Sequence, residues 1–344
     1  MTSRQDFNVF TNGSEVASVF ADRIKGRTGM SPSYFLVTGV SPKSLGGTVA
    51  INLAAHSPAL LLLASRTPSN ITSIINTIDS TTPCPTAAIP LDLSSLSSVR
   101  SAASQITSLT PSLDLIINTA AVVSTTRKLS EDGIELQLAV THVGHFLLTS
   151  LLLPTLISTA ESSRFPKGST RIVNVSSLGH RFSPFRFSDY NFEKFNVPLE
   201  ERPPESVPAT LKGSEEEPYA VFVAYGQSKT ANLLHVVELE RRFRDRGVGS
   251  WGLHPGSIET DLSRELDQGQ RAMIKATSKN WVTLDQGTAT ILVAALDPAL
   301  DEKKGSIYLS DCQLSDAAGH SIDPGAAKRL WELSEKLSGL DGKL

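Results

Sequence analysis

The feature that most constrains the fold of this 344-residue chain is a regular alternation of short apolar runs with longer helical patterns. The run at residues 60–64 is apolar throughout, which is expected of a strand that helices cover on both faces. Strands that alternate with helices form a mostly parallel sheet with helices on both sides. We therefore predict an α/β fold, a doubly wound parallel sheet in a single domain. The predicted strands are residues 34–38, 60–64, 87–91, 113–117, 171–175, 249–253 and 306–309, and the predicted helices include residues 46–56, 133–153 and 222–243.

The alternation divides the chain into three parts. Residues 1–33 precede the first strand, residues 34–312 carry the alternating pattern, and residues 313–344 form a tail that we expect to be helical. The first part is expected to contribute one amphipathic helix, because several apolar residues fall on one helical face. These residues are Val16, Val19, Phe20 and Ile24. Residues 178–221 form a long insert rich in proline, glutamate and phenylalanine, and an irregular segment of that length is usually functional or partly disordered.

Composition and charge exclude several classes of protein. The net charge of −3 and the absence of a long basic run argue against a nucleic-acid partner. The two cysteines, Cys84 and Cys312, are far apart, so a disulfide framework is not expected and a reducing cytoplasm is the simpler location. Residues 1–14 are polar and show no secretory signal, and the most apolar stretch, residues 146–157, is too short to cross a bilayer. We expect a soluble protein without a membrane span.

A glycine turn follows the first predicted strand. Gly39 and Gly46 lie in the run Thr-Gly-Val-Ser-Pro-Lys-Ser-Leu-Gly, and such a turn lets backbone N–H groups approach a pyrophosphate at the start of the next helix, as in a Rossmann-type fold. An ordinary strand–helix turn explains the same glycines equally well. Arg66 follows the second predicted strand, where NAD-binding proteins carry an acidic residue. An arginine suits the 2′-phosphate of NADP(H), which we expect as the cofactor; the alternative is a solvated arginine at a strand end.

The spacing Tyr-x-x-x-Lys occurs in the helix predicted at residues 222–243. Residues four apart share a helix face, so the ammonium group of Lys229 can lie near the phenol of Tyr225. A nearby positive charge lowers the tyrosine pKa from about 10 towards working pH, as a general acid/base for alcohols and carbonyls requires. The spacing alone is common in proteins, but here it comes after Ser176 and Ser177, which follow the fifth predicted strand.

In this order and at this spacing, the motifs resemble the short-chain dehydrogenase/reductase family. The runs Thr-His-Val-Gly-His-Phe at residues 141–146 and Tyr-Gly-Gln-Ser-Lys-Thr-Ala-Asn at residues 225–232 are similar to its retinol-dehydrogenase-like and WW-domain-oxidoreductase-like members. The resemblance implies that Tyr225 is the general acid/base, that Lys229 assists it and binds the nicotinamide ribose, and that Ser177, rather than Ser176, donates to the substrate oxygen. The cofactor-binding residues that it implies are Gly39, Lys43, Ser44, Leu45, Gly46, Arg66, Asp92, Leu93, Asn118, Tyr225, Lys229, Ile258 and Thr260.

Several positions depart from the family pattern. Ser44 replaces the middle glycine of the turn, and Ala121 replaces the glycine of the family's Asn-Asn-Ala-Gly run. Thr141 stands where the family has an asparagine whose carbonyl holds a water bonded to the lysine. A backbone carbonyl survives this substitution, but we expect the local kink that asparagine stabilises to be weakened. His142 and His145 are spaced like a metal pair, yet no third ligand follows, so no metal is expected.

We therefore expect an NADP(H)-dependent oxidoreductase that interconverts a carbonyl and a secondary or primary alcohol by hydride transfer. The first part of the insert, residues 178–195, holds six of the 13 phenylalanine and 5 tyrosine residues, which favours a bulky apolar substrate if their rings wall the site. The alternative is that the rings pin the insert to the domain. These residues are Phe182, Phe185, Phe187, Tyr190, Phe192 and Phe195.

Two other functions compete with this one. A non-catalytic NADP(H)-binding interaction protein of the same fold is favoured by the departures from the family pattern and opposed by the intact serine, tyrosine and lysine. A nucleotide-sugar epimerase or dehydratase would need a Gly-x-x-Gly-x-x-Gly turn and a larger C-terminal domain, and the sequence has neither. By analogy with the family, a homodimer would pair the long helices at residues 133–153 and 222–243.

Overall fold

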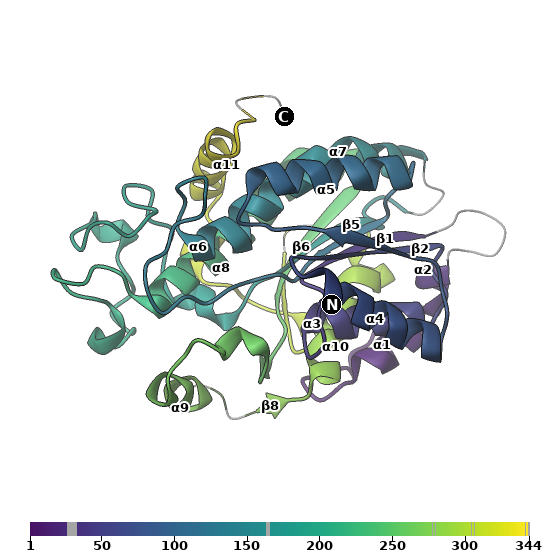
Figure 1. Ribbon diagram of the computed structural model, residues 1–344, viewed down its shortest axis with the longest axis horizontal. Coiled ribbons are helices and arrows are strands. Elements are labelled where there is room, and N and C mark those ends of the chain that lie inside the picture. The colour runs from purple at the N-terminus through teal and green to yellow at the C-terminus, as the bar shows by residue number, and fades with distance from the viewer. Residues whose placement is uncertain are drawn as a thin grey trace.

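The computed structural model describes residues 1–25, 33–162, 166–276, 278, 280–303, 305, 307–340 and 342. Its centre is an eight-stranded sheet of order β10-β9-β6-β5-β4-β1-β2-β3, in which only β10 pairs antiparallel (Figure 1). The predicted doubly wound parallel sheet in one domain is confirmed. The strands are β1 Tyr34–Thr38, β2 Leu60–Ser65, β3 Thr86–Pro90, β4 Leu115–Asn118, β5 Thr170–Val175, β6 Val248–His254, β9 Tyr308–Ser310 and β10 Gln313–Leu314, with β7 Ser257–Ile258 and β8 Trp281–Val282 as a separate pair. Ser306, the predicted start of the last strand, lies outside the described residues.

Helices cover both faces of the sheet, because alternate residues of each strand point to opposite sides. Phe35 and Val37 belong to a core on the side of α1, α3, α4 and α10, whereas Leu36 belongs to a core on the side of α5, α7 and α8 (Figure 1). The helices are α1 Gly13–Val19, α2 Ala21–Lys25, α3 Leu45–Ala54, α4 Pro68–Thr81, α5 Leu96–Leu109, α6 Leu136–Leu138, α7 Gly144–Ser162, α8 Val221–Phe243, α9 Gln268–Ala276, α10 Leu284–Leu296 and α11 Pro324–Ser338.

The N-terminal segment differs from the single helix that the sequence predicts. It forms two short helices, α1 and α2, with Phe20 between them. Val16 and Ile24 are fully buried, whereas Val19 is 42% exposed, so its predicted place on the buried face is wrong. The face of α1 that packs on α10 is instead formed by Gly13, Val16 and Ala17, which follow helical spacing.

The longest apolar helix runs from Leu136 to Ser162 and joins α6, a π-helical turn at Ala139–Val143, and α7. The predicted end at residue 153 is wrong, because α7 continues through Pro154: the helix loses one hydrogen bond there, while Leu156 in the following turn is still buried in the core. Among the described residues this is the one helix long and apolar enough to cross a membrane by length and composition. Its apolar window is 78% buried inside the protein, as in the core helix of a globular fold.

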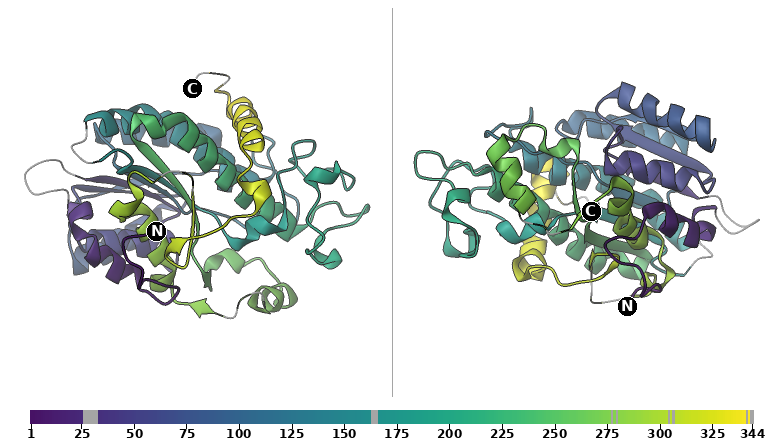
Figure 2. Two further views of the ribbon diagram at one scale, coloured as in Figure 1. Left: turned by 180° about the vertical axis from the view of Figure 1, so that it is seen from behind. Right: turned by 90° about the horizontal axis from the view of Figure 1, so that it is seen from below.

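The insert at residues 178–221 lies at one end of the molecule, beyond α8 and away from β2 and β3 (Figures 1 and 2). Most of its rings pack on the domain, whereas Phe195 is 39% exposed. Phe185 is buried against Phe187, with 4.7 Å between ring centroids, in a cluster that includes Leu234 of α8. Phe192 is buried beneath Tyr219, with 5.9 Å between centroids. These contacts favour the alternative in which the rings pin the insert to the domain.

The C-terminal helix α11 packs on both long helices of one face (Figure 2). Trp331 is fully buried, with its ring centroid 5.0 Å from that of Phe146 on α7 and 6.2 Å from that of Phe243 at the end of α8. The Oγ of Ser334 lies 2.7 Å from the Nε2 of His142. The surface of α7 and α8 that a homodimer was expected to use is therefore covered, where α11 lies, by the chain itself.

Candidate active site

Most of the predicted site residues follow strands at one edge of the sheet. Because the neighbouring strands from β3 to β6 are parallel, their carboxyl ends meet at this edge, and ligands of such sheets bind where the strand order reverses, here between β1 and β4. The predicted residues at this edge are Gly39 after β1, Arg66 after β2, Asp92 and Leu93 after β3, Asn118 at the end of β4, Ser177 after β5, and Ile258 and Thr260 after β6.

The structure brings Ser177, Tyr225 and Lys229 together. Tyr225 and Lys229 lie one turn apart on α8, with the lysine Nζ 5.6 Å from the centre of the tyrosine ring. Ser177 caps the 3₁₀ turn Leu178–Phe182, and its Oγ accepts a hydrogen bond from the N–H of Gly179 at 3.1 Å. Lys229 is buried, whereas Ser177 and Tyr225 are half-buried, so only the last two side chains reach the surface of the site.

Gly179, which the sequence analysis did not single out, is required for this approach. A Cβ at this position would lie 2.9 Å from Cε1 of Tyr225 and 3.4 Å from Oγ of Ser177. A side chain at Gly179 would therefore push apart the two accessible groups of the site. In the sequence, only the place of this glycine in the run Ser-Ser-Leu-Gly could indicate its role. The role itself depends on a contact with a distant helix, which spacing along the chain does not show.

Ser176 has a different place from its neighbour. It is buried, and its Oγ donates to the carbonyl oxygen of Lys229 at 2.8 Å, which ties the end of β5 to α8. Its hydroxyl hydrogen is thus already used. Of the two serines, the half-buried Ser177 is the one beside Tyr225.

The pKa of Tyr225 does not follow the expected direction. Burial raises it to about 12, and the hydrogen bond with Ser177 offsets only part of that increase. Burial also lowers the pKa of Lys229 to about 7, and its Nζ donates to the carbonyl oxygen of Val175 at 2.9 Å. The Tyr225 pKa is therefore raised overall, not lowered as the sequence predicts, because burial outweighs the hydrogen bond with Ser177. The phenol is therefore protonated at neutral pH, as a proton donor must be.

The π-helical turn at Ala139–Val143 contains Thr141, so the local distortion is present without the family's asparagine. The Thr141 carbonyl accepts from Nδ1 of His145 at 3.0 Å and from Nδ2 of Asn232 at 2.9 Å. Burial lowers the pKa of His145 to about 4, so its ring is neutral and its Nε2 accepts from the hydroxyl of Thr38 at 2.9 Å. The side chain of Asn232, a residue of α8, therefore donates to the carbonyl that binds a water in the family pattern.

The two histidines have separate partners, because His142 contacts Ser334 while His145 contacts Thr38 and Thr141. Within the described part of the chain, no group of three or more histidine, cysteine, aspartate or glutamate side chains could hold a metal ion.

The turn after β1 fits a dinucleotide. Gly39 has φ +69°, the left-handed conformation that glycine adopts without strain. Ser44, which replaces a glycine, is the N-cap of α3: its Oγ accepts from the N–H of Gly47 at 3.0 Å. A Cβ at Gly47 would lie 2.2 Å from the carbonyl oxygen of Ser41, so this glycine, which the sequence analysis missed, lets the turn fold onto the helix. The N-terminus of α3 is thereby capped and directed at the sheet edge, where a pyrophosphate would bind.

The other predicted cofactor residues are distributed around this turn. Arg66 and Lys43 are exposed, and Lys43 has φ 58°. The side chains of Leu45 and Ile258 converge on Gly287 at the start of α10, where a Cβ would lie 3.1 Å and 2.3 Å from them. Lys43 and Leu45 thus lie at the start of α3, Ile258 contacts the first turn of α10, and Arg66 follows the neighbouring strand β2.

Three of the predicted cofactor-binding side chains already make hydrogen bonds within the protein. The carboxylate of Asp92 accepts from the N–H and hydroxyl of Ser94 at 2.9 and 2.6 Å. The buried side chain of Asn118 donates to Asn174 at 3.0 Å and so joins β4 to β5. The hydroxyl of Thr260 accepts from the N–H of Leu262 at 3.3 Å. Leu93 is buried in the core on the side of α5 and α7.

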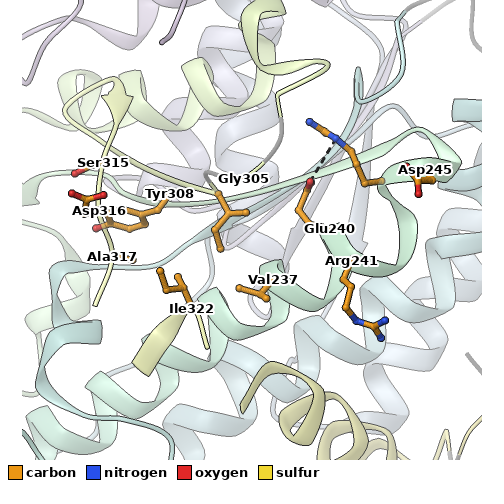
Figure 3. A pocket seen from close by; sticks show the side chains of 12 residues that line it. Val237, Glu240, Arg241, Asp245, Gly305, Tyr308, Ser315, Asp316, Ala317 and Ile322 are labelled. Atoms are coloured by element: carbon orange, nitrogen blue, oxygen red, sulfur yellow. Dashed lines mark ion pairs between the residues drawn. The ribbon is translucent and has the colours of Figure 1, made fainter. Parts of the chain in front are cut away.

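A pocket in the described part of the chain lies apart from these residues. It has a volume of about 550 Å³ and lies between the C-terminal half of α8 and residues 315–322 (Figure 3). Its nearest α8 residue in sequence, Val237, is twelve residues from Tyr225, or roughly 18 Å along the helix. None of the predicted site residues lines it.

Comparison with known proteins shows the family. Residues 33–198 match the model of short chain dehydrogenases. A Brassica napus protein named short-chain dehydrogenase TIC 32 A, chloroplastic, is 38% identical over 252 residues, which are 72% of this chain and 71% of that protein. Retinol dehydrogenase 11 of Mus musculus is 33% identical over 250 residues, 73% of this chain and 69% of that protein. The chain belongs to the short-chain dehydrogenase/reductase family, with retinol dehydrogenases among its relatives as predicted.

Solved structures share the fold. A protein of uncharacterized function from Mycobacterium paratuberculosis superposes with a TM-score of 0.62 at 26% identity, covering 92% of this chain and 96% of that one. An NADPH-bound carbonyl reductase from chicken fatty liver superposes with a TM-score of 0.55 at 21% identity, covering 81% of this chain and 96% of that one.

Proposed function

We propose that this member of the family is an NADP(H)-dependent oxidoreductase that interconverts a carbonyl and an alcohol. The observation that carries the proposal is that the half-buried Ser177 and Tyr225 side chains lie together, with the buried Lys229 beside the tyrosine ring, at the carboxyl end of β5. When bound, the nicotinamide would supply or accept the hydride. In reduction, Tyr225 donates its proton to the carbonyl oxygen, and Ser177 donates a hydrogen bond to the same oxygen and stabilises its developing charge. Lys229 binds the nicotinamide ribose.

The proposed substrate is a bulky apolar carbonyl or alcohol. The aromatic residues of the insert no longer support it, since Phe185 and Phe192 pack inside the protein. Two other observations do. Leu178, the residue after Ser177, is a large apolar side chain that is 42% exposed. Several relatives are named for retinol, an apolar alcohol.

The test is an assay of NADPH oxidation by the purified chain against panels of ketones, aldehydes and quinones, each graded by size and polarity. We expect turnover that increases with apolar bulk within a panel. The rival function, a non-catalytic NADP(H)-binding protein, gains one observation from the Thr141 carbonyl, which two side chains already occupy and which would otherwise serve a water relay. Tight NADPH binding without turnover on any panel would favour that rival.

Arg66 supports NADP(H) over NAD(H), because it is exposed directly after β2, where the adenosine ribose would lie. Arg66→Asp should reverse the preference: the carboxylate repels a 2′-phosphate and accepts from a 2′-hydroxyl. We expect the affinity for NADPH to fall by at least about tenfold, the loss of one charge-assisted hydrogen bond, and the affinity for NADH to rise. The matched control is Arg271→Asp on α9, an arginine with no predicted role. Equal affinity of the unmodified chain for both cofactors, by titration, would contradict the assignment.

The cysteines and the covered face of α7 and α8 bear on location and assembly. Cys84 and Cys312 are both free thiols, which supports a reducing compartment such as the cytoplasm. For a homodimer, the surface of α7 and α8 under α11 gives no support, because Trp331 is buried there.

A further inference from the structure

His180 lies three residues after Ser177, in the 3₁₀ turn that Ser177 caps, and its side chain is fully buried. Its Nδ1 lies 2.6 Å from the carbonyl oxygen of Ser177. Its Nε2 lies 3.1 Å from the backbone nitrogen of Ala318, in the segment between β10 and α11. Both ring nitrogens therefore contact backbone groups, one of them in the residue that donates to the substrate oxygen in the proposed reaction.

The two contacts determine the tautomer of the ring. A backbone N–H can only donate, so Nε2 of His180 must accept from Ala318 and cannot carry a hydrogen. Burial lowers the pKa of His180 to about 4, so the ring is neutral at working pH. The single ring hydrogen is then on Nδ1, where it donates to the Ser177 carbonyl. The N–H of Ala318 thus orients the hydrogen bond that His180 makes to Ser177.

Further contacts fix the turn that carries His180. Its carbonyl oxygen accepts from the hydroxyl of Thr230, the residue after Lys229, at 3.0 Å, and lies 2.9 Å from Nε2 of His320. Its ring lies edge-on to Tyr308 of β9, with 5.3 Å between centroids. The turn is therefore held at once by the helix of the proposed catalytic residues and by residues 318–320.

We propose that His180 is a positioning residue for Ser177, and that the backbone of Ala318, far along the chain, selects the tautomer it needs. The inference rests on the proposed function. By holding the Ser177 peptide, the Nδ1–H of His180 sets the direction of the Cα–Cβ bond and so the place of Oγ beside Tyr225. Misplacement of a reacting or donating group by about 1 Å can lower the rate about 100-fold.

Two substitutions test the contributions of the two ring nitrogens of His180 separately. Asn at this position places an amide where Nδ1 is, so His180→Asn can still donate to Ser177 but loses the contact with Ala318. Gln places its amide where Nε2 is, so His180→Gln can still accept from Ala318 but loses the donor to Ser177. We expect kcat of the Gln variant to fall by about 10- to 100-fold, with NADPH affinity unchanged, and kcat of the Asn variant to stay within a few-fold of the unmodified chain.

A merely structural role predicts a different result, in which both variants lose activity in proportion to their loss of thermal stability. That result would overturn the inference, as would a Gln variant with unchanged kcat. If the unmodified chain turns over no carbonyl compound, the proposed function itself fails, which is a distinct outcome. One measurement needs no variant: ¹⁵N NMR of the ring nitrogens of the whole protein should find the hydrogen of His180 on Nδ1, and a hydrogen on Nε2 would overturn the inference.

Discussion

Tyr225→Phe should lower kcat for carbonyl reduction by about 10²- to 10⁴-fold, the range expected for loss of a general acid. The substitution removes one oxygen atom and keeps the ring that lies against Gly179 and 5.6 Å from Nζ of Lys229. NADPH binding should be retained, because the ring and the lysine stay in place. The loss should therefore appear in kcat and in kcat/KM alike, which marks an interaction made in the transition state.

The matched control is Tyr308→Phe. The Tyr308 hydroxyl is also buried, and it has no hydrogen-bond partner among the described residues, so its removal should leave both stability and turnover nearly unchanged. Steady-state kinetics and NADPH titration of both variants give the comparison. A Tyr225→Phe variant with near-normal turnover would place the acid elsewhere or move the protein towards the non-catalytic rival.

The sheet and the order of the site residues could be predicted because patterns within short stretches of the sequence indicate both. Most strands of the sheet are short apolar runs, and most predicted functional residues follow such a run, so parallel pairing brings these residues to one edge. Tyr225 and Lys229 needed only the spacing of one helical turn. Short motifs and their order likewise indicated the short-chain dehydrogenase/reductase family.

The features of the site that short sequence patterns could not predict depend on contacts between segments far apart in the chain. The close approach of Gly179 to Tyr225 joins two elements 46 residues apart, and the bond between Ala318 and His180 spans 138 residues. The aromatic insert shows the same limit, since composition cannot tell a ring that lines a site from one that packs against Leu234. The predicted direction of the Tyr225 pKa differs from that in the structure for a related reason: the burial that raises this pKa is not visible in the sequence.

A buried ion pair at the opposite edge of the sheet carries the largest expected effect on stability. Arg171, the second residue of β5, is fully buried, and its Nη2 lies 2.5 Å from Oδ1 of Asp301, whose side chain is 4% exposed. Arg23 of α2 contacts the same carboxylate at 2.7 Å. Burial lowers the pKa of Arg171 to about 10, so its guanidinium is still charged at neutral pH. The Asp301 carboxylate thus contacts two arginines, and one of these has no access to water.

Asp301→Asn should lower the free energy of unfolding by about 3–5 kcal/mol, because it keeps the shape of the side chain but removes the carboxylate that pairs with the buried charge of Arg171. Denaturant unfolding followed by fluorescence should show a lower midpoint with the same slope. A second substitution, Arg171→Met, should restore part of the loss, since it removes the charge that Asp301 no longer balances. The control is Glu161→Gln: the Glu161–Arg246 pair has a similar length, 2.7 Å, but both side chains are about half exposed, so the loss should not exceed about 1 kcal/mol. A loss that small for Asp301→Asn as well would show that water or another group compensates Arg171, and the account of this pair would be wrong.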